Sequence, residues 1–425
     1  MIAVLHSALR TDLAKNLTLC VGLSVAFAAC NPPERSDATA FSRQDSLGIL
    51  IVQNAAYPQA PHSDWSISQS PTIAIDDTGS NAAPLATIRG PRLFSDGSFV
   101  FGEAKSRELR FFDARGVHLR TVGRTGQGPG EFAYLDAVFN CAGDTVITWD
   151  VSQRRISKWS RGGAFLTSAL VARRPPGAGG AIKGVSGSCR DLLWDAQPPL
   201  SKHPARWRLP RTLVWQAMQD TVFRTILSYE GLEAEEIISD GMTQTGPVPF
   251  AADPVFAVIG NSVALGLGGK PEYRVYADDG KLLRIVRWPQ VAVPVVDSVR
   301  ALLTNNRELH KKLNPDDAKY ITSIDAHSRM NMLPYYDAMV TGGDGRVWLR
   351  NYRLYDVAIR ADLDKSAERW AVFDSSGKFE ATAVMQPGFQ LTAAANDLVI
   401  GTFTDLLGQL SVRVYDIVKR PPNSR

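Results

Sequence analysis

Three pairs of adjacent aspartates and six scattered histidines are the residues of this 425-residue chain whose types suit metal binding. The pairs are Asp76-Asp77, Asp278-Asp279 and Asp316-Asp317, and carboxylate oxygens are the ligands that Ca²⁺ prefers. No Asp-x-Asp-x-Asp-Gly loop occurs, and turns or helix caps explain all three pairs. The histidines form no short-range pair. The sequence therefore predicts no metal site and no cofactor.

Two glycine-rich stretches have the composition of phosphate-binding loops but lack the other parts of such a loop. Gly126-x-Gly-Pro-Gly130 has no following Lys-Ser/Thr, and its proline removes an amide donor. Gly266-Leu-Gly-Gly-Lys270 continues into Pro271. A serine nucleophile elbow is also missing, because Gly184-Val-Ser-Gly has its glycine one place early. We expect turns at these sites, and the catalytic residues stay unassigned.

The first thirty residues have the pattern of an export signal. Two basic residues precede the apolar stretch Leu17–Ala29, which is shorter than the about 20 residues that a bilayer-spanning helix needs. The stretch ends in Phe27-Ala-Ala-Cys30, which resembles the lipobox of bacterial lipoproteins. The sequence predicts a signal peptide over residues 1–29, a lipid on Cys30 and a flexible tether over 30–46. A plain secretory signal or a retained membrane anchor is the alternative.

The elements of the rest of the chain are short β-runs broken by Gly, Asp and Asn turns. A unit of apolar strands, polar turns and an aromatic-Asp segment recurs about every 40–50 residues, which is the length of a four-stranded propeller blade. The copies begin near residues 91, 136, 185, 256, 338 and 390.

This repeat predicts an all-β fold, a six-bladed β-propeller over residues 47–420. A single blade cannot bury both faces, whereas a closed ring buries them and protects the strand edges. The last copy is short, so we expect the N-terminal strands at 47–52, 65–67 and 72–75 to complete it and close the ring. Stacked β-sandwich domains are the alternative, and the constant internal order of the repeat favours the propeller.

The decapeptide Gly123–Phe132 follows the first Phe-Asp-x-x-Gly copy. Here the chain resembles the blade junction of bacterial six-bladed β-propeller lipoproteins related to NHL-repeat proteins. The resemblance covers most of the chain after about residue 46 and implies a ring in the periplasm or on the outer membrane. The junction residues, for which we expect a structural role, are Gly126, Gly128, Gly130, Glu131 and Phe132.

Of the four cysteines, Cys20 would be lost with the signal peptide and Cys30 would carry the lipid, which leaves Cys141 and Cys189. They occupy matching places in adjacent copies of the repeat, each just before a central strand. An oxidising compartment would permit them to pair, so the sequence predicts a disulfide. Two buried free thiols are the alternative.

One segment departs from the β pattern. Asp297–Leu313 has apolar residues at helical spacing behind an aspartate that suits the N-cap position. Asn314-Pro315 then indicates a stop and a new helix start, with a second helix to about His327. The sequence therefore predicts a helical hairpin inserted over residues 297–328.

The chain has 47 basic and 43 acidic side chains, a net charge of only +4, which argues against nucleic acid as a partner. We favour a non-catalytic envelope protein that contacts the membrane through its lipid and binds an unidentified protein, peptide or glycan. The other hypothesis is an extracytoplasmic hydrolase or lyase with its site in the central channel. Three or more carboxylates, histidines or amides converging there would favour the enzyme.

Overall fold

The computed structural model describes most of the chain between residues 41 and 419. The described ranges are 41–55, 64–77, 85–199, 206–239, 242–313, 330–354 and 367–419. Ala40–Arg425 forms one compact unit. The predicted signal peptide, Cys30, the tether up to residue 40 and the predicted second helix lie outside the described residues.

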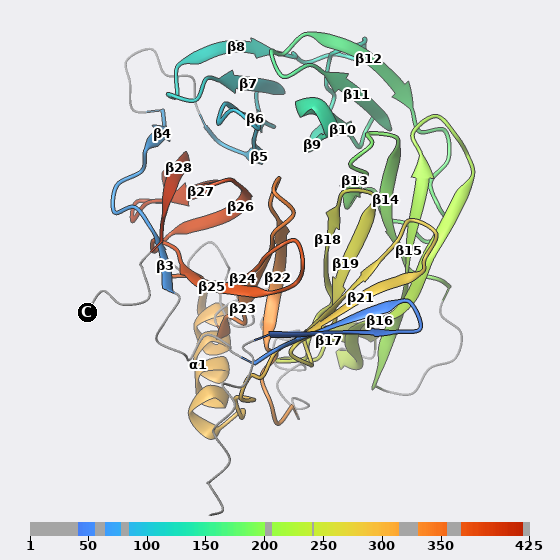
Figure 1. Ribbon diagram of the computed structural model, residues 1–425, viewed down its shortest axis with the longest axis vertical. Helices are drawn as coiled ribbons and strands as arrows, with labels where there is room; N and C mark the ends of the chain where they lie inside the picture. Colours follow the sequence, from blue (N-terminus) through green and yellow to red (C-terminus); the bar gives the residue numbers. More distant parts are fainter. Residues whose placement is uncertain are drawn as a thin grey trace, which may run out of the picture. The chain divides into compact units, whose positions relative to one another are not determined.

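Two four-stranded antiparallel sheets come first in the ring (Figure 1). The first consists of β5 (Ile88–Leu93), β6 (Phe99–Glu103), β7 (Glu108–Phe112) and β8 (His118–Val122). The second consists of β9 (Leu135–Cys141), β10 (Thr145–Asp150), β11 (Arg155–Trp159) and β12 (Phe165–Leu170), with the short 3-10 helix η1 (Ala142–Asp144) after β9. Each strand pairs with the next in the chain, as in consecutive hairpins.

The third and fourth sheets follow the same order and carry additional strands. The third consists of β13 (Gly184–Val185), β14 (Asp191–Ala196), β15 (Arg206–Ala217), β16 (Phe223–Ser239) and β17 (Met242–Pro247). The fourth consists of β18 (Val255–Ile259), β19 (Ser262–Gly266), β20 (Glu272–Tyr276) and β21 (Leu282–Arg287), extended by β2 (Ile49–Asn54) and β1 (Phe41–Ser46).

The remaining two units are joined into one nine-stranded sheet by an N-terminal strand. The fifth consists of β22 (Tyr336–Thr341), β23 (Val347–Asn351), β24 (Arg369–Phe373) and β25 (Phe379–Val384), and the sixth of β26 (Phe389–Ala395), β27 (Leu398–Thr404) and β28 (Leu410–Lys419). The N-terminal strands are β3 (Asp64–Ile67) and β4 (Ile73–Ile75). β3 lies between β25 and β28, and β4 pairs with β28 as the fourth strand of the last unit. These two strands complete the last unit, as predicted.

The first N-terminal hairpin differs from the prediction. β2 pairs in parallel with β21 of the fourth unit, and β1 pairs with β2. Residues 47–52 therefore do not complete the last unit, and residues 41–46 form a strand where a tether was expected. Val52 is fully buried and packs with Tyr273 and Val286. This apolar contact fixes the hairpin on the fourth unit.

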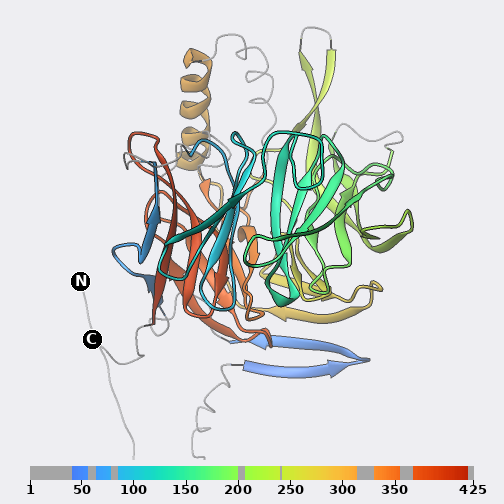
Figure 2. The same cartoon turned by 90° about the horizontal axis from the view of Figure 1, so that it is seen from above.

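The first strands of the six units form a closed cycle. β5 contacts β9, β9 contacts β13, β13 contacts β18, β18 contacts β22, β22 contacts β26, and β26 contacts β5. Figures 1 and 2 show the sheets arranged around this centre. The all-β propeller is confirmed, and the six inner strands are consistent with the six predicted blades. We number the blades one to six, from β5 to β28.

The same turn closes the outer hairpin of four blades. It spans residues 113–117, 160–164, 277–281 and 374–378, and its first residue donates its N–H to the carbonyl oxygen of its fifth. The fourth residue is always glycine, with φ between 80° and 89°. Glycine adopts this left-handed conformation without steric cost. The repeat seen in the sequence is therefore a repeat of backbone geometry.

The helix α1 (Asp297–Leu313) lies between β21 and β22, where the first half of the helical hairpin was predicted. At its base, Val299 packs against a small apolar cluster that contains Phe250, Val295 and Leu333. None of the described helices is long and apolar enough to cross a membrane.

Candidate functional site: the central channel

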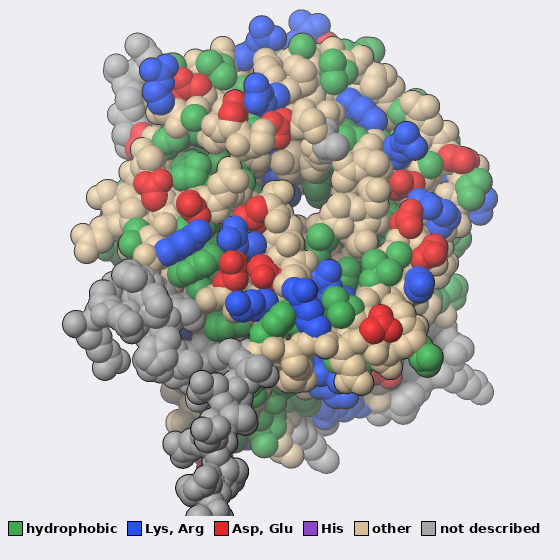
Figure 3. All heavy atoms as spheres, in the orientation of Figure 1, with side chains coloured by type: hydrophobic (Ala, Val, Ile, Leu, Met, Phe, Trp, Pro, Cys, Tyr) green, Lys and Arg blue, Asp and Glu red, His purple; other side chains and the backbone are tan. Residues whose placement is uncertain are grey.

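A cavity of about 820 Å³ lies where the inner strands of all six blades end. Figure 3 looks down the ring and shows the opening at its centre. The cavity is lined by the last residues of the inner strands and by the turns that follow them. We call these six turns the turn face, and they span residues 94–98, 142–144, 186–190, 260–261, 342–346 and 396–397. Every blade therefore contributes to the lining.

Each blade is bonded to the next at or beside this face. The contacts, in ring order, are Ser95 Oγ to Asp144 Oδ2 (2.7 Å), the Cys141–Cys189 disulfide, Gly187 N–H to the Gly260 carbonyl (2.6 Å), Thr341 Oγ1 to the Val258 carbonyl (2.8 Å), Gly343 N–H to the Ala394 carbonyl (3.0 Å), and Arg92 Nη1 to the Thr392 carbonyl (3.0 Å). Because the contacts run round the whole ring, they fix the spacing of the blades and the width of the cavity.

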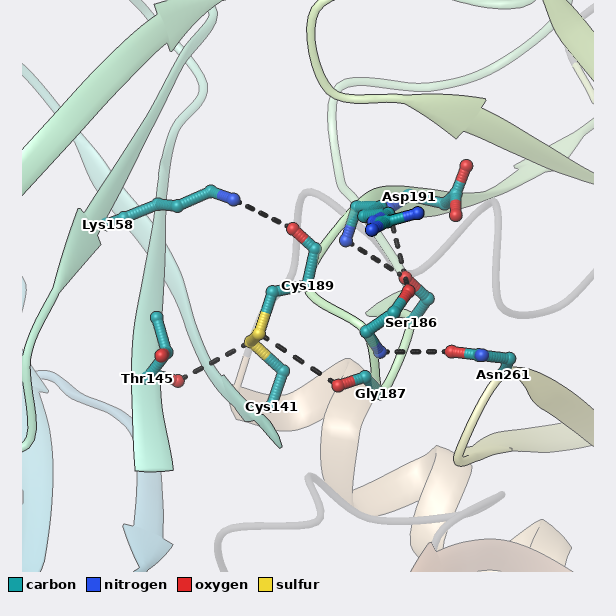
Figure 4. Close-up of a disulfide and its surroundings, with 10 residues drawn as sticks. Cys141, Thr145, Lys158, Ser186, Gly187, Cys189, Asp191 and Asn261 are labelled. Atoms are coloured by element: carbon teal, nitrogen blue, oxygen red, sulfur yellow. Dashed lines mark hydrogen bonds between the residues drawn. A yellow bond between two sulfur atoms is a disulfide. The ribbon is translucent and has the colours of Figure 1, made fainter. Parts of the chain in front are cut away.

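The disulfide joins blades two and three at the edge of the cavity (Figure 4). Cys141 ends β9, and Cys189 lies in the turn before β14, with the two Cα atoms 5.5 Å apart. Lys158 Nζ of β11 donates to the carbonyl oxygen of Cys189 at 2.8 Å. The predicted pairing is therefore present, and it is of the kind that persists in oxidising compartments.

Five side chains that carry a carboxylate or an amide line the cavity: Asp144, Asp344, Asn140, Asn261 and Asn396. Their number meets the criterion that we set for an enzyme. Each of them is hydrogen-bonded within the turn face or beside it. Asn140 donates to the Leu93 carbonyl, Asn261 accepts from the Ser188 N–H, and Asn396 donates to the Ser95 carbonyl. Asp344 is paired with Arg346. These groups hold turns together.

Arg92 lies near the end of β5 and lines the cavity. Its Nε donates to the Val138 carbonyl of blade two at 3.2 Å, and its Nη1 donates to the Thr392 carbonyl of blade six. The guanidinium also lies 5.9 Å from the centre of the Phe139 ring. Burial lowers the pKa of Arg92 to about 10, so the side chain stays charged at neutral pH.

Lys183 is the second basic residue of the lining. It directly precedes β13, and its backbone N–H donates to the Leu193 carbonyl at 2.8 Å. Its side chain is exposed, and no described carboxylate lies within ion-pair distance of its ammonium group. Sequence reasoning singled out neither Arg92 nor Lys183. One signal for them was available in the sequence. Each is a basic residue within or directly before an inner strand, at a position where the inner strands of the other blades carry apolar residues.

The residues of the predicted blade junction lie away from the cavity. Glu131 accepts hydrogen bonds from the Gly128 N–H and from Arg124 Nε, both at 2.8 Å. The Gly126 N–H donates to the Phe132 carbonyl, and the Phe132 ring is buried. Gly130 has φ 76°, a conformation that favours glycine. The junction is thus a compact turn closed by its own carboxylate.

The histidines and acidic pairs do not assemble a metal site among the described residues, where no three suitable side chains lie together. His118 contacts Thr121 on the exposed strand β8, and the other histidine side chains are outside the described set. Asp77 accepts a hydrogen bond from Gln409, and Asp279 accepts one from the Lys281 N–H.

No protein-family model and no curated protein sequence matches the chain. Among solved structures, a DUF4221 member from Bacteroides vulgatus has 7% identity and a TM-score of 0.47, with 84% of this chain and 99% of that chain covered. A Bacteroides fragilis protein thought to be exported has 11% identity and a TM-score of 0.44 (87% and 99% covered). A Xanthomonas campestris gluconolactonase has 10% identity and a TM-score of 0.38 (83% and 100% covered). The propeller assignment rests on the strand order of this chain.

Proposed function

We propose that the chain is an exported, lipid-anchored propeller of the bacterial envelope that binds a ligand in its central channel without transforming it. The observation that carries the proposal is the cavity of about 820 Å³, a volume within the about 300–1,000 Å³ typical of small-molecule sites. The carboxylates that line it are bonded to serine or arginine in the turn face. These contacts give both carboxylates a structural role in joining the turns, and the binding proposal assigns them no other.

The anchor of this proposal is a lipid on Cys30, placed before the first described strand by the predicted tether. An exported location agrees with the disulfide between Cys141 and Cys189. We expect the wild-type protein to fractionate with membranes and the Cys30→Ser variant to appear in the soluble envelope fraction. A variant that stays in the membrane fraction to the same extent as the wild type would contradict the anchor.

The ligand site is tested by a calorimetric screen of sugars, short peptides and organic acids. Ser188 lines the cavity and is exposed, so Ser188→Trp places a large ring at its mouth. Ser70→Trp adds the same ring at an exposed position outside the lining. We expect compounds that bind the wild type and Ser70→Trp but not Ser188→Trp. A screen without such a compound would contradict the proposal.

The second hypothesis, a hydrolase or lyase with its site in the channel, is favoured by one observation, the five amide and carboxylate side chains of the lining. The same screen separates the two hypotheses. The binding proposal predicts that each bound compound is recovered chemically unchanged after prolonged incubation. Asp136 lies in β9 outside the lining, so Asp136→Asn is the control. Turnover of a compound that is lost in Asp144→Asn but kept in Asp136→Asn would instead establish the enzyme.

A further inference from the structure

The charged residues that line the cavity differ in how they are paired. The two acidic residues, Asp144 and Asp344, are each close to an arginine that lies outside the lining. Asp144 is 3.7 Å from Arg161, and Asp344 is paired with Arg346. The two basic residues, Arg92 and Lys183, have no described carboxylate within ion-pair distance. Arg92 and Lys183 are therefore the charged residues of the lining that have no ion-pair partner among the described residues.

Arg92 has donors left for a ligand. A guanidinium has five N–H donors in a planar fork that matches a carboxylate. Two of them bind the carbonyl oxygens of Val138 and Thr392, and no described residue accepts from the other three. The two carbonyl contacts hold the fork between the inner strands of blades two and six. A cation that is fixed and partly withdrawn from water gains more from an anion than a solvated one does.

The rest of the lining suits an organic molecule. Five of its apolar side chains, all accessible in part, come from three different blades: Phe139, Phe256, Val258, Met339 and Val340. An inorganic ion would fill only a small part of the volume and would leave these side chains uncovered. An acid with an apolar body would place its charge at the basic residues and cover the apolar surface.

We propose that the channel binds a small organic carboxylate, with the carboxylate on the free N–H donors of Arg92 and with Lys183 supplying a second positive charge. This inference rests on the proposed function and adds the chemical class of its ligand. The ligand's apolar body lies against Phe139 and its neighbours in the lining.

The probe pair is benzoate and benzamide, which share size and ring but differ in charge. Calorimetric titration of the folded, processed chain at low ionic strength is expected to show benzoate binding about tenfold more tightly than benzamide. Added salt should weaken benzoate binding and leave benzamide binding unchanged, because the interaction is between charges.

Two variants assign the preference to the basic residues. Arg92→Gln is expected to lower benzoate affinity about tenfold. Arg92 also joins three blades, so its substitution could disturb the fold. Lys183→Gln avoids this, because the Lys183 side chain has no described contact to lose, and we expect it to lower benzoate affinity about threefold. Lys105→Gln, an exposed lysine outside the lining, is the matched control and should bind like the wild type.

Equal affinities for benzoate and benzamide, or a Lys183→Gln variant that folds and keeps the full preference, would overturn the carboxylate inference. Absence of benzoate binding to the wild type would overturn it as well. If neutral compounds of the wider screen still bind and are blocked by Ser188→Trp, the proposed function stands without this inference. If nothing in the screen depends on Ser188, both fail.

Discussion

The two faces of the ring are held together in different ways. On the turn face, each blade is bonded to the next by a disulfide or by hydrogen bonds that run round the whole cycle. The opposite ends of the inner strands carry α1, the long ends of β15 and β16, and residues 330–335, which we call the insertion face. Figure 2 shows α1 and the β16–β17 hairpin extending to the same side.

The insertion face is held by side-chain packing and by hydrogen bonds among its own segments, such as those from the Val295 N–H to the Asn331 carbonyl (2.9 Å) and from the Leu333 N–H to the Val293 carbonyl (2.8 Å). Phe250, Val295 and Leu333 form its apolar cluster, to which α1 adds Val299. Arg206 at the start of β15 lies 3.0 Å from Met330 Sδ. These contacts fasten added segments to the ring but do not close it. From this comparison we expect the turn face to contribute to the stability of the whole propeller and the insertion face to affect mainly the order of its own segments.

Loss of the disulfide is the largest expected change on the turn face. In the chain-entropy model, a cross-link of this span contributes about 3–4 kcal/mol to the free energy of unfolding. We expect urea unfolding of Cys141→Ser/Cys189→Ser to show a loss of that size. Wild-type protein that has been reduced and alkylated is the control and should match the variant. A loss below about 1 kcal/mol would show that the hydrogen bonds alone hold this face.

Leu333→Ala tests the insertion face. Removal of a buried leucine side chain costs about 2–5 kcal/mol, and here we expect the cost to fall on the added segments. Proteolysis within Asp297–Leu313 should become faster while the urea midpoint of the ring stays near the wild-type value. Leu192→Ala, fully buried between blades two and three, is the matched control and should lower the midpoint. A similar midpoint for both variants would remove the distinction between the faces.

Asn261→Ala removes one hydrogen bond between blades three and four. Asn261 accepts from the Ser188 N–H at 3.0 Å, and the loss of one such bond costs about 1 kcal/mol. The urea midpoint should therefore fall slightly but measurably. Asn305→Ala on α1, an exposed position of the insertion face, should cause no loss. Equal effects would mean that the turn-face bond has no special role.

Glu131 gives the smallest expected effect, through pH. Hydrogen bonds from the Gly128 N–H and from Arg124 lower the pKa of its carboxyl group. A lowered folded-state pKa contributes stability above the unfolded value of about 4.3, and this stability is lost as the pH falls through the folded value. The Tm of the wild type should thus decrease more steeply below about pH 4.5 than the Tm of Glu131→Gln. Parallel curves would contradict this assignment.

Local patterns in the sequence predicted the repeat, the helix start and the disulfide, because each depends on residues within one or two blades. The β4 strand was also predictable, since a short last copy requires a partner from elsewhere. The position of β2 could not be predicted, because a parallel pairing with β21 at the edge of a sheet leaves no recognisable residue pattern in either strand. The role of Arg92 depends on ring closure, which brings Thr392 within 3.0 Å of it from 300 residues away. Spacing along the chain carries no record of such a contact.

The central claim, that the channel binds a small organic carboxylate, is tested most directly by titrating benzoate into the wild type and into Ser188→Trp by calorimetry. Both proteins must first show the same urea midpoint, so that a folding defect is not mistaken for a blocked site. The account predicts saturable binding of one benzoate to the wild type and its loss in Ser188→Trp. Equal binding to both proteins, or binding to neither, would contradict it.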